Sequence, residues 1–201
     1  MRVESVNVGN VEPIEWEGRI LETGFRKKSV EGRVAFTGVN LAGDDQADRS
    51  VHGGPRKAVY VYPSEHYAEW RRSLRLPHLA FGGFGENLTT SGWLESDARR
   101  GDVVRIGTAM FEVARPRAPC VKMNAVFRRP DMIDRFHRSG RSGFYLAAVQ
   151  DGELGAGDPI ELVRRVQGAP SIADMIQSSR GAGTDLRALD EPPPAGPPAD
   201  R

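Results

Sequence analysis

Short segments rich in Val, Ile, Phe and Tyr, separated by glycines, run along most of the chain, and this pattern restricts the fold more than any other feature. Such residues favour strands, and glycines between them favour turns. Gly107 lies between two of these segments as in a hairpin turn. Many short strands with glycine turns are typical of a β-sandwich or a β-barrel. The expected strands are Arg2–Val8, Ile14–Leu21, Arg33–Val39, Ala58–Tyr62, Asp102–Ile106, Thr108–Val113, Phe144–Val149 and Pro159–Val163.

Two helices are expected between the strands. The first begins at Pro63, which suits the first turn of a helix, and its apolar residues keep helical spacing through Leu74. The second spans Asp131–Ser139, and Gly140 follows it as a C-cap. The apolar stripe of each helix is expected to pack on the core. The fold is therefore expected to be mostly β with inserted helices.

Length and composition indicate one main domain followed by a short appendage. The chain has 201 residues, which is enough for a single hydrophobic core, and residues 1–166 are expected to form it. Within residues 167–201, Ser171–Ser178 is expected to form a short helix with Ser171 as its N-cap. The segment EPPPAGPPAD then holds five of the 14 prolines and no aromatic residue, so a disordered, Pro-rich tail is expected.

Charge and cysteine content restrict the partners and the compartment. The 28 Lys and Arg residues are balanced by 27 Asp and Glu residues, so nucleic acid is not expected as an electrostatic partner. The single cysteine excludes an intrachain disulfide and suits a reducing compartment. The chain has no apolar run long enough for a membrane span and no apolar N-terminal signal. A cytoplasmic location is therefore expected, and no association with a membrane is expected.

The segment FEVARPRAPCVKMN contains this cysteine, Cys120, after Pro116 and Pro119. Proline has no backbone N–H, so the segment is expected to be a loop that follows a short strand at Met110–Val113 and not a central strand. A free cysteine is most often a small buried apolar residue, and the local sequence alone leaves that role open.

The charges around the thiol favour a second role. Arg115, Arg117 and Lys122 flank Cys120. Nearby cations favour the thiolate over the thiol, and the thiolate is the form that binds soft metals and attacks electrophiles.

Two glycine-rich segments are candidates for ligand binding. His52, Gly53 and Gly54 precede Arg56 and Lys57. A glycine pair lets backbone amides turn towards an anion, and the two cations could bind a phosphate, although a surface turn with solvated cations has the same composition. The pattern of a phosphate-binding P-loop is absent.

The second segment, FGGFGENLTTSG, contains Glu86 and Asn87. Asn87 could contact a ligand through its amide or simply cap a turn. The segment does not match a dinucleotide-binding fingerprint. The four histidines show no metal-ligand spacing, so a zinc site is weakly supported.

Taken together and in this order, the segments at Asp48 and Val51–Trp70, at Phe84–Gly92 and at Pro116–Met123 resemble the MOSC-domain family (molybdenum cofactor sulfurase C-terminal domain), close to its YiiM-like branch. The resemblance covers about residues 1–165. It implies a closed β-barrel that holds a molybdenum cofactor, in which a pyranopterin dithiolene and one protein cysteine bind the molybdenum. The matching position here is Cys120. An association with pyridoxal phosphate binding is a further expectation attached to the family.

The resemblance also implies an activity, the reduction of N-hydroxylated compounds, including hydroxylaminopurine-type base analogues, to amines. This reduction consumes two electrons and two protons and releases water. The branch often carries several C-terminal helices, whereas here only Ser171–Ser178 is expected to be helical. On this basis Cys120 is the expected metal ligand, with Cys120 and His52 catalytic, and the expected cofactor-binding residues are Gly53, Gly54, Arg56, Lys57, Glu86, Asn87, Arg117 and Lys122.

Two further classes of function remain open at this point. Cys120 could carry a persulfide and pass sulfur on, or the chain could bind the cofactor without turnover. The sequence contains no flavin, haem or iron–sulfur motif, so a reductase of this kind would depend on a separate flavoprotein electron donor. Its other partner would be a small N-hydroxylated substrate. The oligomeric state cannot be read from the sequence.

Overall fold

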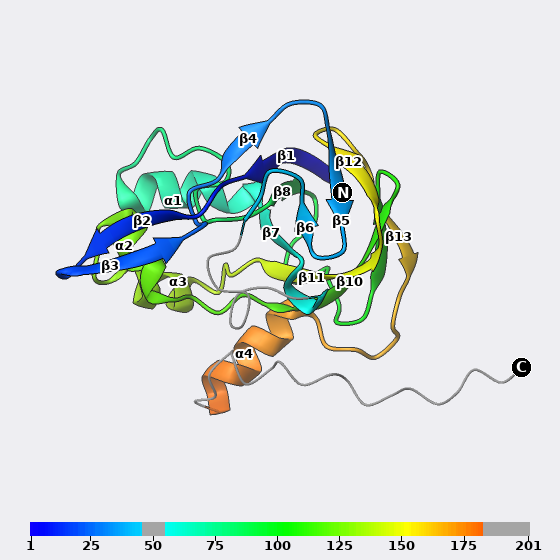
Figure 1. Cartoon of the computed structure of the whole chain (residues 1–201). Coiled ribbons are helices and arrows are strands. Elements are labelled where there is room, and N and C mark those ends of the chain that lie inside the picture. Colours follow the sequence, from blue (N-terminus) through cyan, green and yellow to red (C-terminus); the bar gives the residue numbers. More distant parts are fainter. Residues whose placement is uncertain (46–54, 183–201) are drawn as a thin grey trace, which may run out of the picture.

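An eight-stranded sheet forms the body of the protein (Figure 1). The computed structural model describes residues 1–45 and 55–182. The strand order is β13-β9-β10-β11-β7-β8-β1-β4, and every pair is antiparallel except the parallel pair β7–β8. The strands are β1 Arg2–Val8, β4 Lys28–Val30, β7 Val59–Pro63, β8 Leu88–Ser91, β9 Val103–Ile106, β10 Ala109–Pro116, β11 Phe144–Gln150 and β13 Ile160–Arg164.

The remaining strands form two small antiparallel sheets. One contains β12 Gly152–Gly155, β5 Arg33–Thr37 and β6 Asn40–Leu41, and the other is a hairpin of β2 Glu12–Trp16 and β3 Arg19–Thr23. The single strand expected over Ile14–Leu21 is therefore wrong. Glu17 and Gly18 both have positive φ angles, 51° and 73°, as the two central residues of a tight hairpin turn require.

The closed barrel expected from the family resemblance is not formed by the described residues, because the edge strands β13 and β4 do not pair with each other. One isolated bridge, between Arg2 and Pro159, joins the start of β1 to the segment before β13. The Val3 N–H donates to the Asp158 carbonyl at 3.0 Å beside this bridge. The Ile160 N–H likewise donates to the Met1 carbonyl at 3.0 Å, so β1 meets the start of β13 at this bridge while the edge strands β13 and β4 stay unpaired with each other.

Strand β10 corrects a further expectation. It continues through Pro116, which pairs with Phe144 of β11, and it lies inside the sheet between β9 and β11. Proline is tolerated here because the pairing with β9 has already ended at Glu112, so one side of the strand end needs no donor.

The helices lie around the sheet. Their observed bounds and caps agree with those expected from the sequence to different degrees. Pro63 closes β7 and does not begin the first helix, which starts at Tyr67 after a short 3-10 turn. The second expected helix is confirmed within one residue, and Gly140 caps it with φ 73°. The expected N-cap Ser171 is also confirmed, because its Oγ accepts a hydrogen bond from the Asp174 N–H at 3.1 Å. The helical elements are η1 Pro55–Lys57, η2 Ser64–His66, α1 Tyr67–Leu74, α2 Val121–Phe127, α3 Met132–Ser139 and α4 Ile172–Ala182.

Two apolar clusters hold the described part of the chain together. The larger joins residues of the main sheet to residues of the three-stranded sheet and includes Ile172 and Ile176 of α4, so this helix docks on the domain. The smaller is mostly aromatic and joins β7 to α1, α2 and α3, which lie together near the β2–β3 hairpin (Figure 1). Trp70 and Phe136 belong to it, which confirms that the apolar helix stripes face the core. No described helix is long and apolar enough to cross a membrane.

Candidate functional site

Cys120 lies where the main sheet passes into the aromatic cluster. Strand β10 ends at Pro116, and four residues later Cys120 precedes α2 as its N-cap, with an extended backbone. Its carbonyl accepts a hydrogen bond from the Met123 N–H at 2.9 Å, which starts the helix. The thiol is partly exposed. The segment after Cys120 was expected to be a loop, and the helix α2 was missed because two prolines precede it.

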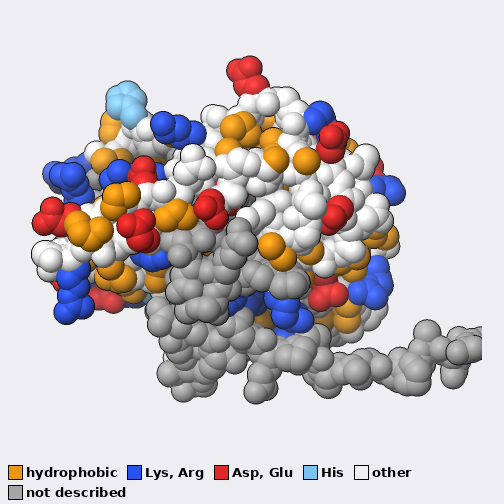
Figure 2. All heavy atoms as spheres, viewed as in Figure 1, with side chains coloured by type: hydrophobic (Ala, Val, Ile, Leu, Met, Phe, Trp, Pro, Cys, Tyr) orange, Lys and Arg blue, Asp and Glu red, His pale blue; other side chains and the backbone are white. Residues whose placement is uncertain are grey.

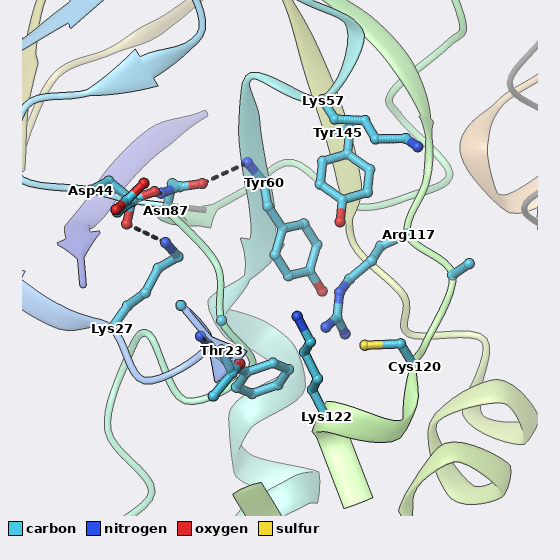
Figure 3. Close-up of a pocket in the computed structure, with 15 residues that line it drawn as sticks. Thr23, Lys27, Asp44, Lys57, Tyr60, Asn87, Arg117, Cys120, Lys122 and Tyr145 are labelled. Carbon is cyan, nitrogen blue, oxygen red and sulfur yellow. Dashed lines mark hydrogen bonds and ion pairs between the residues drawn. The ribbon is translucent and has the colours of Figure 1, made fainter. Parts of the chain in front are cut away.

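A pocket of about 660 Å³, its open mouth included, surrounds this thiol. Figure 3 shows side chains from well-separated parts of the chain gathered around it. The lining residues are Thr23, Gly24, Phe25, Lys27, Asp44, Asp45, Lys57, Tyr60, Gly85, Asn87, Arg117, Ala118, Cys120, Lys122 and Tyr145. Five residues chosen from the sequence are among them: Lys57, Asn87, Arg117, Cys120 and Lys122. The structure therefore brings together residues that lie up to 65 positions apart in the sequence (122 − 57).

Arg117 is the most unusual residue of the pocket. It is only 5% exposed, and its guanidinium lies 4.9 Å from the ring of Tyr60, 5.1 Å from that of Phe25 and 5.5 Å from that of Phe136. Its Nη1 atom is buried and has no hydrogen-bond partner among the described residues. A buried donor without a partner is costly, so its presence in a pocket wall indicates a place for an anionic or carbonyl-bearing ligand.

The surroundings of Arg117 keep it charged. Burial lowers its pKa, but Tyr60, Tyr145 and Cys120 outweigh that effect and hold the pKa above its ordinary value. Figure 3 shows the Cys120 sulfur on the guanidinium side of the pocket, with the Lys122 amine also directed towards this region. The positive charge around the sulfur favours a thiolate and an anionic ligand beside it.

The wall opposite Cys120 has a different chemistry. The Lys27 ammonium forms an ion pair with the Asp44 carboxylate, and the Asn87 Nδ2 donates to the same carboxylate at 2.8 Å. The Oδ1 of Asn87 accepts a hydrogen bond from the Tyr60 N–H at 3.1 Å. Asn87 therefore joins β7 to the segment that carries Asp44, and both ends of its amide are used within the protein.

Glu86 and Arg56 lie outside the pocket lining. Glu86 is fully buried, and its carboxylate accepts hydrogen bonds from the backbone N–H groups of Gly82 and Phe84 and from the hydroxyls of Tyr67 and Thr89. These bonds fix the glycine-rich turn that precedes β8. Glu86 thus fixes the backbone beside the lining residues Gly85 and Asn87 without lining the pocket itself.

Three other residues chosen from the sequence, His52, Gly53 and Gly54, lie outside the described residues. Conversely, sequence reasoning missed Lys27, Asp44, Tyr60 and Tyr145. The tyrosines stand in strand patterns that indicate core packing, and the Lys27–Asp44 pair is formed by residues with no shared motif. The basic run Arg26–Lys28, which follows Gly24 and Phe25, is the one weak sign in the sequence that this segment could contact an anionic ligand.

The donor set also restricts the kind of metal site. Within residues 1–45 and 55–182, no three His, Cys, Asp or Glu side chains gather closely enough to hold a metal ion.

Comparison with known proteins places this site in a family. The family model described as "MOSC domain" matches residues 48–161, and the chain belongs to this family. The match includes Lys57, Asn87, Arg117 and Cys120.

Particular relatives place the chain near YiiM. The crystal structure of YiiM from Geobacillus stearothermophilus superimposes with a TM-score of 0.69 at 34% identity, over 88% of this chain and 82% of that one. The uncharacterized protein YflK of Bacillus subtilis (strain 168) is 39% identical over 170 residues, or 85% of this chain and 76% of YflK. A protein named "Reductase" from Gibberella moniliformis is 31% identical over 177 residues, which cover 87% of this chain but only 31% of that protein.

Proposed function

We propose that the protein is a molybdenum-cofactor-dependent reductase that converts small N-hydroxylated compounds, such as hydroxylamines and hydroxylaminopurine-type bases, to amines. The observation that carries this proposal is a partly exposed cysteine in a pocket whose wall holds a buried guanidinium with an unpaired Nη1. Membership of the MOSC domain family and the name of the Gibberella relative support it. That relative is much longer than the matched segment, so its name is evidence of a class of activity and no more.

The residues of the pocket fit an anionic molybdenum cofactor. The Cys120 thiolate is a soft ligand suited to molybdenum, and Arg117 offers its unpaired Nη1 to a negatively charged or carbonyl oxygen. Lys57 and Lys122, both partly exposed, line the same pocket and could bind a phosphate. When bound, the cofactor would supply the two electrons of the reduction.

The protein would contribute binding, orientation and protons. The rings of Phe25, Tyr60 and Tyr145 line the pocket and could hold a planar substrate by stacking. The Tyr60 hydroxyl donates to the Ser142 carbonyl at 2.8 Å, so this ring is fixed before any ligand binds. Fixed aromatic walls would exclude water and position the N–O bond.

The electrons would come from a separate flavoprotein. The full sequence has a single cysteine and no flavin motif, so a second redox centre in this chain is not expected. We therefore expect no turnover with NADH or NADPH alone, and turnover with a reduced viologen. A cytoplasmic location is part of the same proposal.

A direct experiment combines metal analysis with an activity assay. Purified protein should contain molybdenum, and with a reduced viologen it should convert a panel of N-hydroxylated bases and amidoximes to the amines, measured by chromatography. Cys120→Ser should lose this activity and keep its far-UV circular dichroism spectrum, because an alkoxide is a harder ligand than a thiolate.

The outcomes separate the remaining classes of function. Molybdenum-containing protein that fails on the whole panel would leave a cofactor-binding module without turnover. Sulfide released from Cys120 by added thiol, without metal, would indicate a sulfur carrier, a role that the partly exposed thiol also permits.

A further inference from the structure

A buried ion pair forms the pocket wall opposite Cys120. The side chains of Lys27 and Asp44 are 7% and 2% exposed, and both residues line the pocket (Figure 3). The Asp44 carboxylate also accepts hydrogen bonds from the Gly9 N–H at 3.0 Å and from the Asn87 Nδ2 at 2.8 Å. Asp44 is therefore held in place from three directions and in turn fixes the lysine.

Such a pair contributes little to stability, because removing two charges from water costs as much as their attraction returns. A reason other than stability must therefore account for a buried lysine in this wall. An ammonium has three N–H donors, and Asp44 accepts one of them. The side chain lies at the cavity, so a ligand in the pocket can reach the amine.

We propose that Lys27 is the proton donor of the reduction, giving its proton to the oxygen that leaves when the N–O bond of an N-hydroxylated substrate is broken, with Asp44 as the residue that positions it. This inference rests on the proposed function. It adds a catalytic residue that lies far in sequence from Cys120 and outside the part of the chain that matches the family model.

The step is balanced as follows. The N–O bond breaks, and the departing oxygen keeps its own proton and takes a second from Lys27, so it leaves as water. The bound cofactor would supply the two electrons, and the nitrogen takes one proton from solvent and becomes the amine. Lys27 then regains a proton from solvent. Hydroxide is a poor leaving group, so protonation of the oxygen is the part of the reaction for which an acid is most useful.

The electrostatic environment of the lysine supports this role. Burial lowers the pKa of Lys27, and the nearby carboxylates of Asp44, Glu86 and Asp45 oppose this effect only in part. A lowered pKa makes the ammonium a stronger acid near neutral pH. The other charged and titratable groups that line the same pocket are Asp44, Asp45, Lys57, Tyr60, Arg117, Cys120, Lys122 and Tyr145.

The sign of the pH dependence follows. The protonated amine is the active form, so kcat should fall as the pH rises through the pKa of Lys27. Asp44→Asn removes a charge that raises the pKa of Lys27, so the pH at which kcat begins to fall should be lower in this variant. If Lys27 only supported the fold, Asp44→Asn would not shift the pH dependence of kcat in this way.

The decisive test is chemical rescue of Lys27→Ala in the cofactor-loaded protein, with a reduced viologen as electron donor. We expect kcat to fall at least about 100-fold, as for other losses of a general acid, with a much smaller change in KM and unchanged molybdenum content per folded molecule. Added methylamine or ethylamine should restore part of the rate, and a series of amines should show a rate that depends on amine pKa. Lys28→Ala, an exposed neighbour, is the matched control and should behave as the wild type.

A second variant guards against misfolding, because Lys27→Ala leaves the Asp44 charge buried without its partner. The double variant Lys27→Gln with Asp44→Asn removes both charges and keeps hydrogen-bonding groups, so it should fold, hold molybdenum and show the same loss of kcat. Independently of activity, ¹³C NMR of lysine-labelled, cofactor-free protein should show Lys27 titrating below Lys28, and lower still in Asp44→Asn.

Two results would overturn the inference. Loss of molybdenum in parallel with activity in the Lys27 variants would make Lys27 a cofactor-binding residue, and wild-type kcat in these variants would show that the proton comes from elsewhere. In both cases the wild type remains an active reductase, whereas molybdenum-loaded wild type without activity would instead refute the proposed function.

Discussion

Replacing Arg117 by methionine should separate ligand binding from stability. Methionine has a similar length and no charge, and it can pack its sulfur against the rings of Phe25, Tyr60 and Phe136 that now surround the guanidinium. Three cation–π contacts return at most about 6 kcal/mol, at about 2 kcal/mol each when desolvated. Burial of the ion costs several kcal/mol. The two effects nearly cancel, so the free energy of unfolding of cofactor-free Arg117→Met should change by no more than about 1 kcal/mol.

Cofactor binding should respond very differently. A hydrogen bond from a charged donor contributes about 1.5–3 kcal/mol, which corresponds to roughly 10- to 150-fold weaker binding when it is lost. The assay compares urea unfolding of the cofactor-free protein with the cofactor content of protein purified from a molybdate-supplied host, measured from the fluorescence of the released, oxidised pterin.

The control is Arg105→Met, the same substitution at an exposed residue paired with Glu161, and it should change neither quantity. The reasoning is refuted if Arg117→Met keeps its full cofactor content while its free energy of unfolding falls by more than about 3 kcal/mol, the range of a lost structural contact.

Three further substitutions test the roles of other parts of the site. Lys57→Ala should lower cofactor content while the free energy of unfolding falls by less than about 0.5 kcal/mol, since Lys57 is only partly buried; a lower melting temperature with unchanged cofactor content would make it structural. Glu86→Gln should lose about 2–4 kcal/mol of stability in urea unfolding, because the Gln amide nitrogen cannot accept the hydrogen bonds that the carboxylate accepts; an unchanged unfolding midpoint would contradict this role. Gly85→Ala should cost about 1–3 kcal/mol, because φ is +78° and the added Cβ would lie 3.2 Å from the Phe25 ring; a melting temperature equal to that of the wild type would show that the turn adapts.

The sequence pattern predicts the main strands because they are regular and apolar. Strands β1, β7, β9 and β11 lie within one residue of the expected bounds at each end. Short pieces such as β6 at Asn40–Leu41 carry too few residues for any pattern. Helix α2 was missed because local signals, two prolines and two β-branched residues, oppose a helix that its packing on the aromatic cluster stabilises.

The candidate site was predicted where its residues are neighbours in sequence. Arg117, Cys120 and Lys122 lie within six positions, so their proximity needs no tertiary information. Lys27 and Asp44 come from segments beside β1, and only the pairing of β1 with β4 and β8 brings them to the pocket. No property of those residues in isolation marks them as partners.

The pocket is assembled across a boundary in the chain, and this has a consequence for how such proteins diversify. The family model begins at residue 48, whereas the wall that carries Phe25, Lys27 and Asp44 comes from the first 45 residues. Mutations in that opening stretch can therefore alter which molecules are accepted while the cysteine and its cationic neighbours are left untouched. Exchanging residues 1–47 between relatives would be the natural way to transplant a ligand preference without changing the part of the chain that matches the family model.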